Sequence, residues 1–262
     1  MGLNSSASRA STTLASEGHT VIAAARKAAD LEARVKSDSI PNTHVLHADL
    51  TSPDSLRAAA TTTASLVPSG IDHLIINGAY ISEANQVPTE FSDKPELFLS
   101  EFLKSAEVNV AGPLFAINAF LPLLRKGAEK RVTYVSSGLA DLKESLTVGS
   151  TTTVPYSASK AAGNLVIARF AAELKEEGLT FLSIAPGVVA TEMMLETSAN
   201  MTGIEAEKMQ GMFRGMAQKY PDWKGPVSTQ ESVDKVLKVV KGAKVEQSGL
   251  FLSYHGNTTE WV

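Results

Sequence analysis

The chain has no cysteine among its 262 residues, which excludes disulfide bonds and a thiolate nucleophile. Because a chain without disulfides suits a reducing compartment, we expect the protein to be cytoplasmic. Any redox chemistry would have to use a bound cofactor. The histidines lack the spacing of a metal site, so we predict that none of them binds a metal: His19, His44, His47, His73 and His255.

Charge of one sign and long apolar runs are also scarce. The formal net charge is -4 and no long basic run occurs, so we expect neither nucleic acid nor a membrane as a partner and favour a small-molecule ligand. No stretch approaches the ~20 apolar residues of a membrane span, and the N-terminus lacks the apolar centre of a signal peptide. With 44% hydrophobic residues, the chain can form a single α/β domain over residues 1–262.

Short apolar segments alternate with longer stretches of helical periodicity. We predict strands over 20–25, 43–46, 73–76, 131–135, 180–184 and 249–253, and helices over 28–37, 53–66, 96–125, 156–177 and 229–240. This alternation predicts a Rossmann-like, doubly wound parallel sheet with helices on both faces. Ligands of such sheets bind beyond the carboxyl ends of the strands, where Asn77, Ser137 and Pro186-Gly187 are expected.

Tyr156 and Lys160 are four residues apart in a predicted helix, which places a phenol and an ammonium on one face. Pro155 suits the start of that helix. Because a nearby cation favours phenolate, we expect Lys160 to lower the pKa of Tyr156 and make it a proton donor. The spacing alone also fits an exposed amphipathic helix. The other polar groups expected at the same edge of the sheet favour the chemical interpretation.

Six motifs, taken in order, resemble those of the short-chain dehydrogenase/reductase family over residues 18–262. They are Asp49 after a strand, Ile76-Asn77-Gly78-Ala79, Asn109-Val110-Ala111-Gly112, Ser136-Ser137, Tyr156-Ser157-Ala158-Ser159-Lys160, and Pro186-Gly187-Val188-Val189-Ala190-Thr191. Within the family, the chain resembles carbonyl-reductase-type members, including those that tailor fungal secondary metabolites.

The resemblance implies a catalytic set of Asn109, Ser137, Tyr156 and Lys160. Tyr156 would exchange a proton with the substrate oxygen while a nicotinamide ring supplies or accepts hydride. Lys160 would also hold the ribose hydroxyls, Ser137 would stabilise charge on the substrate oxygen, and the Asn109 backbone carbonyl would hold a relay water. On chemistry alone, Ser137 equally fits a turn, and Asn109 a buried amide bonded to neighbouring backbone. Ser136 should point to the opposite face of its strand.

The resemblance also implies a dinucleotide cleft that includes the catalytic Tyr156 and Lys160 and is lined by Asp49, Asn77, Gly78, Pro186, Gly187, Val189 and Thr191. Two plain alternatives exist, since Asp49 could cap the next helix and residues 186–191 could form a simple turn. An acidic residue that binds the ribose of NAD is expected after the second strand, but Ala24-Ala25-Arg26-Lys27 stands there. We therefore predict NADP (NADPH), with Arg26 at the 2′-phosphate, the alternative being that Arg26 and Lys27 are only solvated.

Residues 1–18 depart most from the family, which has an apolar strand and a glycine-rich turn at this point. Gly2 matches the first glycine, whereas Ser6 and Ser8 replace the other two, so we expect the phosphates to be crowded or repositioned. Helix N–H groups at this turn would still attract an anion. The first strand is apparently missing. We expect a truncated or alternatively spliced start, the alternatives being direct pairing of the neighbouring strands or another segment or subunit in the gap.

Every methionine except Met1 falls within residues 191–226, for which we predict a flexible lid over an apolar substrate. Packing of these residues on the core is an equal alternative: Met193, Met194, Met201, Met209, Met212 and Met216. The stripe of Val166, Phe170 and Leu174 fits either the core or a subunit contact. The resemblance implies a homodimer or homotetramer.

The leading hypothesis is an NADP-dependent oxidoreductase that interconverts a carbonyl and an alcohol on an apolar small molecule. The first alternative is a non-redox pseudoenzyme or scaffold of the same fold that cannot bind dinucleotide. The second is a cofactor-free catalyst that uses Tyr156 and Ser137 for acid–base chemistry.

Overall fold

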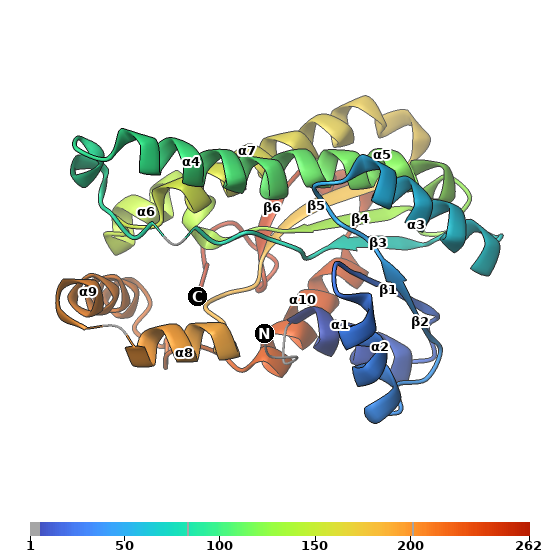
Figure 1. Cartoon of the computed structure of the whole chain (residues 1–262), viewed down its shortest axis with the longest axis horizontal. Coiled ribbons are helices and arrows are strands. Elements are labelled where there is room, and N and C mark those ends of the chain that lie inside the picture. The colour runs from blue at the N-terminus through green and yellow to red at the C-terminus, as the bar shows by residue number, and fades with distance from the viewer. Residues whose placement is uncertain (1–5, 83, 201) are drawn as a thin grey trace.

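The computed structural model describes residues 6–82, 84–200 and 202–262 and contains the expected α/β fold (Figure 1). All paired strands are parallel, and their bounds agree with the predicted ones to within two residues. They are β1 Val21–Ala25, β2 Thr43–His47, β3 His73–Ile76, β4 Arg131–Val135, β5 Thr180–Ala185 and β6 Phe251–Ser253.

The helices connect these strands and cover both faces of the sheet (Figure 1). They are α1 Ser6–Ser16, α2 Ala28–Ser37, α3 Pro53–Leu66, α4 Pro95–Ala106, α5 Gly112–Leu124, α6 Leu142–Val148, α7 Val154–Glu173, α8 Glu192–Asn200, α9 Gly203–Lys219 and α10 Thr229–Gly242. The predicted helix over 96–125 is α4 and α5 joined by a π-helical turn, Glu107–Ala111. The sequence did not predict α6.

The sheet is divided into two pieces in the described part of the chain. β1 pairs with β2, and β3, β4, β5 and β6 pair in that order, but β1 and β3 are not hydrogen-bonded to each other. The alternative in which the two neighbours of the missing strand pair directly is therefore wrong. Between residues 6 and 20, the chain forms α1 and no strand, and α1 packs against α10 and β1.

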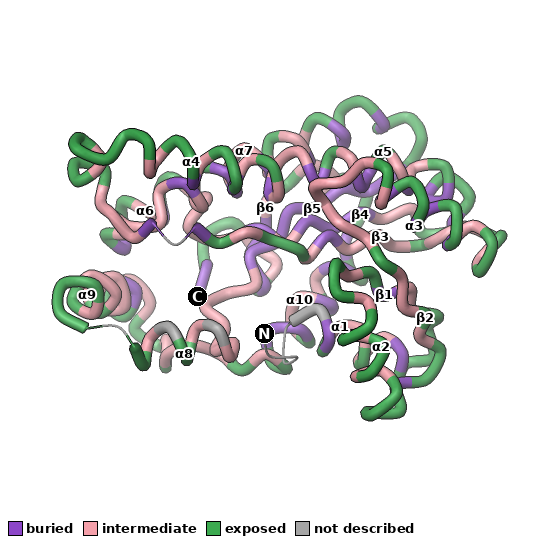
Figure 2. The backbone as a smooth tube through the Cα atoms, in the orientation of Figure 1, coloured by how far each residue is buried: buried purple, intermediate pink, exposed green. Residues whose placement is uncertain are grey.

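The hydrophobic core lies around the four-stranded sheet (Figure 2). Ile117, Tyr134, Ile167 and Phe181 are fully enclosed there, between α5, α7 and the sheet. The predicted stripe on α7 belongs mainly to this core, since Phe170 and Leu174 are buried and Val166 packs against them. Its interpretation as a subunit contact is not favoured.

The continuous helical segment Pro95–Leu124 is long and apolar enough to cross a membrane by length and composition. The expectation that no stretch approaches a membrane span was therefore too strong. In this fold the segment packs against α3 and α7 and buries the polar side chains of Glu101, Ser105 and Asn109. Such packing is what a core helix of an α/β protein requires.

Candidate active site

Tyr156 and Lys160 lie in the first turns of α7, as the sequence predicted. Pro155 occupies the first turn of this helix, where its missing N–H costs no hydrogen bond. Lys160 is only 1% exposed, and its Nζ donates a hydrogen bond to the backbone carbonyl of Val135, 2.7 Å away. This bond ties α7 to the end of β4, so the pair is fixed at the carboxyl edge of the sheet.

The pKa of Tyr156 is shifted in the direction opposite to the predicted one. Burial raises it to about 12, and a hydrogen bond with the Ser137 side chain offsets part of that rise. Lys160 does not offset this rise, because it has lost its charge at the pH where Tyr156 titrates. Burial also lowers the pKa of Lys160 to about 7, so its charge is incomplete near neutral pH. The phenol is thus protonated at neutral pH.

Ser137 lies just beyond β4 and has the turn role considered for it, whereas a hydrogen bond from Ser137 to a substrate oxygen stays a prediction. Its Oγ accepts a hydrogen bond from the backbone N–H of Leu139 at 3.3 Å, which caps a short 3-10 turn, and its side chain also bonds Tyr156. Ser136 is buried, and its Oγ has no hydrogen-bond partner among the described residues. Of the two serines, Ser137 is the one whose side chain interacts with the Tyr156 phenol and lowers its pKa.

Asn109 lies in the π-helical turn, with its side chain fully buried. Its Nδ2 donates to the Tyr80 carbonyl at 2.8 Å and to Ser159 Oγ at 2.9 Å, and its Oδ1 accepts from the Tyr80 N–H. The amide therefore joins the segment after β3 to α7. Its backbone carbonyl accepts a hydrogen bond from the hydroxyl of Tyr134 at 2.9 Å, which leaves only the second lone pair of that carbonyl for the predicted relay water.

The predicted cleft residues near the adenosine end follow β1, β2 and β3. Asp49 Oδ1 accepts hydrogen bonds from the N–H and hydroxyl of Thr51, each at 2.9 Å, and these bonds lower the Asp49 pKa. The cap of α3 is Ser52 rather than Asp49. Asn77 is half-buried beyond β3, and a Cβ at Gly78 would lie 2.8 Å from Leu50. Gly78 therefore permits close packing between the ends of β2 and β3.

Residues 186–191 form the turn that leaves β5. Gly187 has a φ of +81°, and a Cβ there would lie 2.8 Å from the ring of Tyr254, so the position requires glycine. The Pro186 carbonyl accepts from Ser232, Val189 bridges to Val227, and Thr191 Oγ1 accepts the N–H of Met194 at the start of α8. The turn interpretation is confirmed for this segment, and contact with a nicotinamide remains a prediction.

The predicted phosphate turn is described only in part. Gly2 lies outside the described residues, Ser6 begins α1, and Ser8 is buried within that helix. Arg26 lies exposed just beyond β1, and its charge contributes to lowering the pKa of Asp49. The cation therefore lies on the same side of the fold as the predicted adenosine contacts.

Groups at the two ends of the predicted cleft suit a nicotinamide dinucleotide. The Lys160 ammonium has three N–H donors and gives one to Val135, so donors remain for ribose hydroxyls. Arg26 offers a guanidinium suited to a phosphate. No group of three His, Asp or Glu side chains in the described ranges is placed to hold a metal ion.

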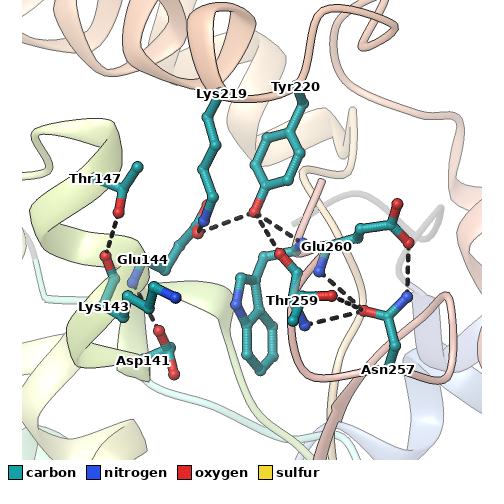
Figure 3. Close-up of polar contacts among 10 residues, drawn as sticks. Asp141, Lys143, Glu144, Thr147, Lys219, Tyr220, Asn257, Thr259 and Glu260 are labelled. Atoms are coloured by element: carbon teal, nitrogen blue, oxygen red, sulfur yellow. Dashed lines mark hydrogen bonds and ion pairs between the residues drawn. The ribbon is translucent and has the colours of Figure 1, made fainter.

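The predicted lid consists of α8 and α9, and α9 is fastened to the rest of the protein by a buried carboxylate (Figure 3). Glu144 of α6 is 1% exposed and forms an ion pair with Lys219, and it accepts the Tyr220 hydroxyl at 2.9 Å. Met216 is buried against Val148, so this methionine packs on the core. The Met193 side chain and all of Met201 lie outside the described residues.

A sequence profile described as short chain dehydrogenase matches residues 7–202. The short-chain dehydrogenase/reductase atnB of an Arthrinium species is 36% identical over 240 residues, which cover 90% of this chain and 88% of that protein. The short chain dehydrogenase virK of Hypocrea virens is 35% identical over 225 residues, covering 84% of this chain and 81% of that protein.

Among solved structures, the fold is similar to that of a carbonyl reductase from chicken fatty liver with bound NADPH. The TM-score is 0.68 at 24% sequence identity, and the match covers 92% of this chain and 86% of that one. At this identity the likeness supports the fold, which is the arrangement of strands and helices described above.

Proposed function

Because this chain belongs to the short-chain dehydrogenase/reductase family, we propose that it is a carbonyl-reductase-like, NADP-dependent enzyme that interconverts a carbonyl and an alcohol on an apolar small molecule. The observation that supports this most directly is the meeting of Tyr156, Ser137 and Lys160 at one edge of the sheet. A phenol that lies beside a serine hydroxyl and a buried lysine can donate a proton to a substrate oxygen. The serine hydroxyl can stabilise the negative charge that develops on that oxygen.

In this proposal the chain binds the substrate oxygen and moves one proton. A bound nicotinamide ring supplies or accepts the hydride. The Tyr156 hydroxyl donates its proton to the substrate oxygen during reduction, and Ser137 donates a hydrogen bond to the same oxygen as negative charge develops there. Lys160 holds the ribose, and its positive charge stabilises the phenolate left on Tyr156.

The protonation states favour reduction near neutral pH. With a pKa raised to about 12, Tyr156 carries the proton that reduction requires, whereas oxidation requires the phenolate. Lys160, with a pKa near 7, is charged below that pH and loses its charge above it. We therefore expect the rate of reduction to fall as the pH rises through 7.

Arg26 supports NADP over NAD, because a guanidinium pairs with a 2′-phosphate and no acidic residue stands beside it at positions 24–27. The family as a whole uses a nicotinamide dinucleotide, and the carbonyl reductase described above was solved with NADPH. An apolar substrate is supported by leucines exposed on the helices that follow Ser137 and Thr191, namely Leu142, Leu146 and Leu195.

We also propose a homodimer or homotetramer that acts in the cytoplasm without nucleic acid, membrane or metal. Leu99 and Leu103 on α4 and Leu165 on α7 are each more than half exposed, and the two helices pack against each other. A pair of helices with exposed leucines suits contact with a second copy. The chain has no cysteine, which suits a reducing compartment.

The proposed activity is tested by incubating the protein with NADPH and a panel of apolar ketones and aldehydes. Oxidation of NADPH that depends on the carbonyl compound, with the alcohol identified by mass spectrometry, is the expected result. Tight NADPH binding without turnover of any compound in either direction would instead favour the scaffold. Turnover in the absence of any dinucleotide would favour the cofactor-free catalyst.

A further inference from the structure

A second phenol lies directly behind the proposed catalytic pair. Tyr134 of β4 is fully buried, and its hydroxyl donates to the Asn109 carbonyl at 2.9 Å. The face of its ring lies against the Lys160 ammonium, with Nζ 4.6 Å from the ring centre. One side chain thus contacts two of the four predicted catalytic residues.

The Tyr134 ring stabilises the positive charge of Lys160, which has no carboxylate partner among the described residues. Burial is the cause that lowers the Lys160 pKa, and no carboxylate in the described part of the chain offsets it. The titratable groups that face the ammonium are Tyr134 from β4 and Tyr156 from α7, while Val135 contributes a backbone carbonyl. An aromatic face favours the charged form of a cation placed over it.

The surrounding backbone is shaped to admit this phenol. Gly163 lies one turn after Lys160 on α7, and a Cβ at that position would be 2.5 Å from the Tyr134 hydroxyl oxygen and 2.8 Å from the Asn109 carbonyl oxygen. Any larger residue would displace one of these atoms. The strand β4, the π-helical turn and α7 therefore meet at the Tyr134 hydroxyl.

We propose that Tyr134 is a positioning residue of the active site, whose ring seats the Lys160 ammonium and whose hydroxyl fixes the Asn109 carbonyl. The proposal rests on the oxidoreductase function proposed above. It assigns separate roles to the two parts of Tyr134, since the ring positions Lys160 and the hydroxyl positions the Asn109 carbonyl. Each half can be removed separately by substitution.

The first test measures the ionisation of Lys160 without any turnover. The protein is labelled with ¹³C at the lysine Cε atoms, and the Lys160 signal is identified by its loss in Lys160→Met. Tyr134→Phe keeps an aromatic ring and should leave the titration midpoint within a few tenths of a pH unit of its original position. Tyr134→Leu removes the ring and should lower the midpoint by about half a pH unit or more.

Phe181→Leu is the matched control, because Phe181 is equally buried in the same core and stacks on Phe170 rather than on the lysine. It should leave the Lys160 midpoint unchanged. A Tyr134→Leu midpoint that stays in place or rises, or a Phe181→Leu shift of the same size, would overturn the seating role. If Tyr134→Leu does not fold, Tyr134→Met is measured with the same expectation.

The second test separates the hydroxyl from the ring by kinetics. Tyr134→Phe should lower kcat by about fivefold to tenfold with KM unchanged, because a loss of ~1 kcal/mol of hydrogen bonding acts on the alignment of Asn109. An unchanged kcat would overturn the role of the hydroxyl. If the wild-type protein turns over no carbonyl compound, the proposed function fails, whereas the lysine titration still decides whether Tyr134 seats Lys160.

Discussion

The two pieces of the sheet differ in how firmly they are built. In β1 and β2 only Ala23 is buried, whereas all six residues of β5 are buried between helices. Tyr156, Ser137, Lys160 and Asn109 belong to the four-stranded piece or to the helices packed on it. Arg26 belongs to the two-stranded piece. The residues proposed for proton transfer thus lie on the buried, four-stranded piece, whereas the residue proposed to select the cofactor lies on the more exposed, two-stranded piece.

The largest expected effect lies in the firmly built piece. Tyr156→Phe removes the only proton donor assigned to the substrate oxygen and should lower kcat by roughly 10²- to 10⁴-fold, measured by NADPH oxidation. Tyr254→Phe is the control, since it removes a tyrosine hydroxyl elsewhere while keeping a ring in place. Equal activity of the Tyr156 variant and the wild type would refute the mechanism.

A neighbouring pair of serines offers the next test. Ser137→Ala removes the hydroxyl that bonds Tyr156 and should lower kcat by about 10²- to 10³-fold. Ser136→Ala should change kcat by less than about twofold, because the Ser136 Oγ has no hydrogen-bond partner among the described residues. Steady-state kinetics of both variants would distinguish the two serines. An equal loss of kcat in the two variants would contradict the role assigned to Ser137.

The difference between the two pieces of the sheet should appear in amide hydrogen exchange. A two-stranded sheet is marginally stable, so the β1 amides should exchange about a hundredfold faster than those of β5, measured by mass spectrometry or NMR. Similar protection in both strands would show that the two-stranded piece is held more firmly than its exposure suggests.

The smallest effect is expected at Arg26. Arg26→Ala should weaken NADPH binding by about tenfold to a hundredfold, since a charge-assisted hydrogen bond to a phosphate is lost, and should leave NADH binding unchanged. Lys27→Ala provides the matched control, with an expected change below about threefold. A loss of affinity for both cofactors after Arg26→Ala would mean that the residue acts through the fold rather than through the 2′-phosphate.

The sequence predicted the parts of the molecule in which local pattern and tertiary packing agree. Periodicity located β5, and Pro155 located the start of α7, because each of these signals depends on nearby residues. The shift in the Tyr156 pKa was predicted with the wrong sign, since the burial of Tyr156 and of Lys160 depends on the packing of α7 against β4.

The role of Tyr134 was missed for the same reason. In the sequence it is one aromatic residue of a predicted strand, and neither of its partners is close to it along the chain. The contact with Asn109 spans 25 residues. The only signal in the sequence was Gly163, a glycine inside a helix, which marks a close approach of another part of the chain.

Calorimetric titration of the protein with NADPH and NADH decides whether the chain binds a dinucleotide and which one it prefers. We expect NADPH to bind more tightly than NADH, and we expect the difference in affinity to disappear in Arg26→Ala. Absence of binding by either dinucleotide to the folded protein would contradict the account and leave the catalytic residues without a source of hydride.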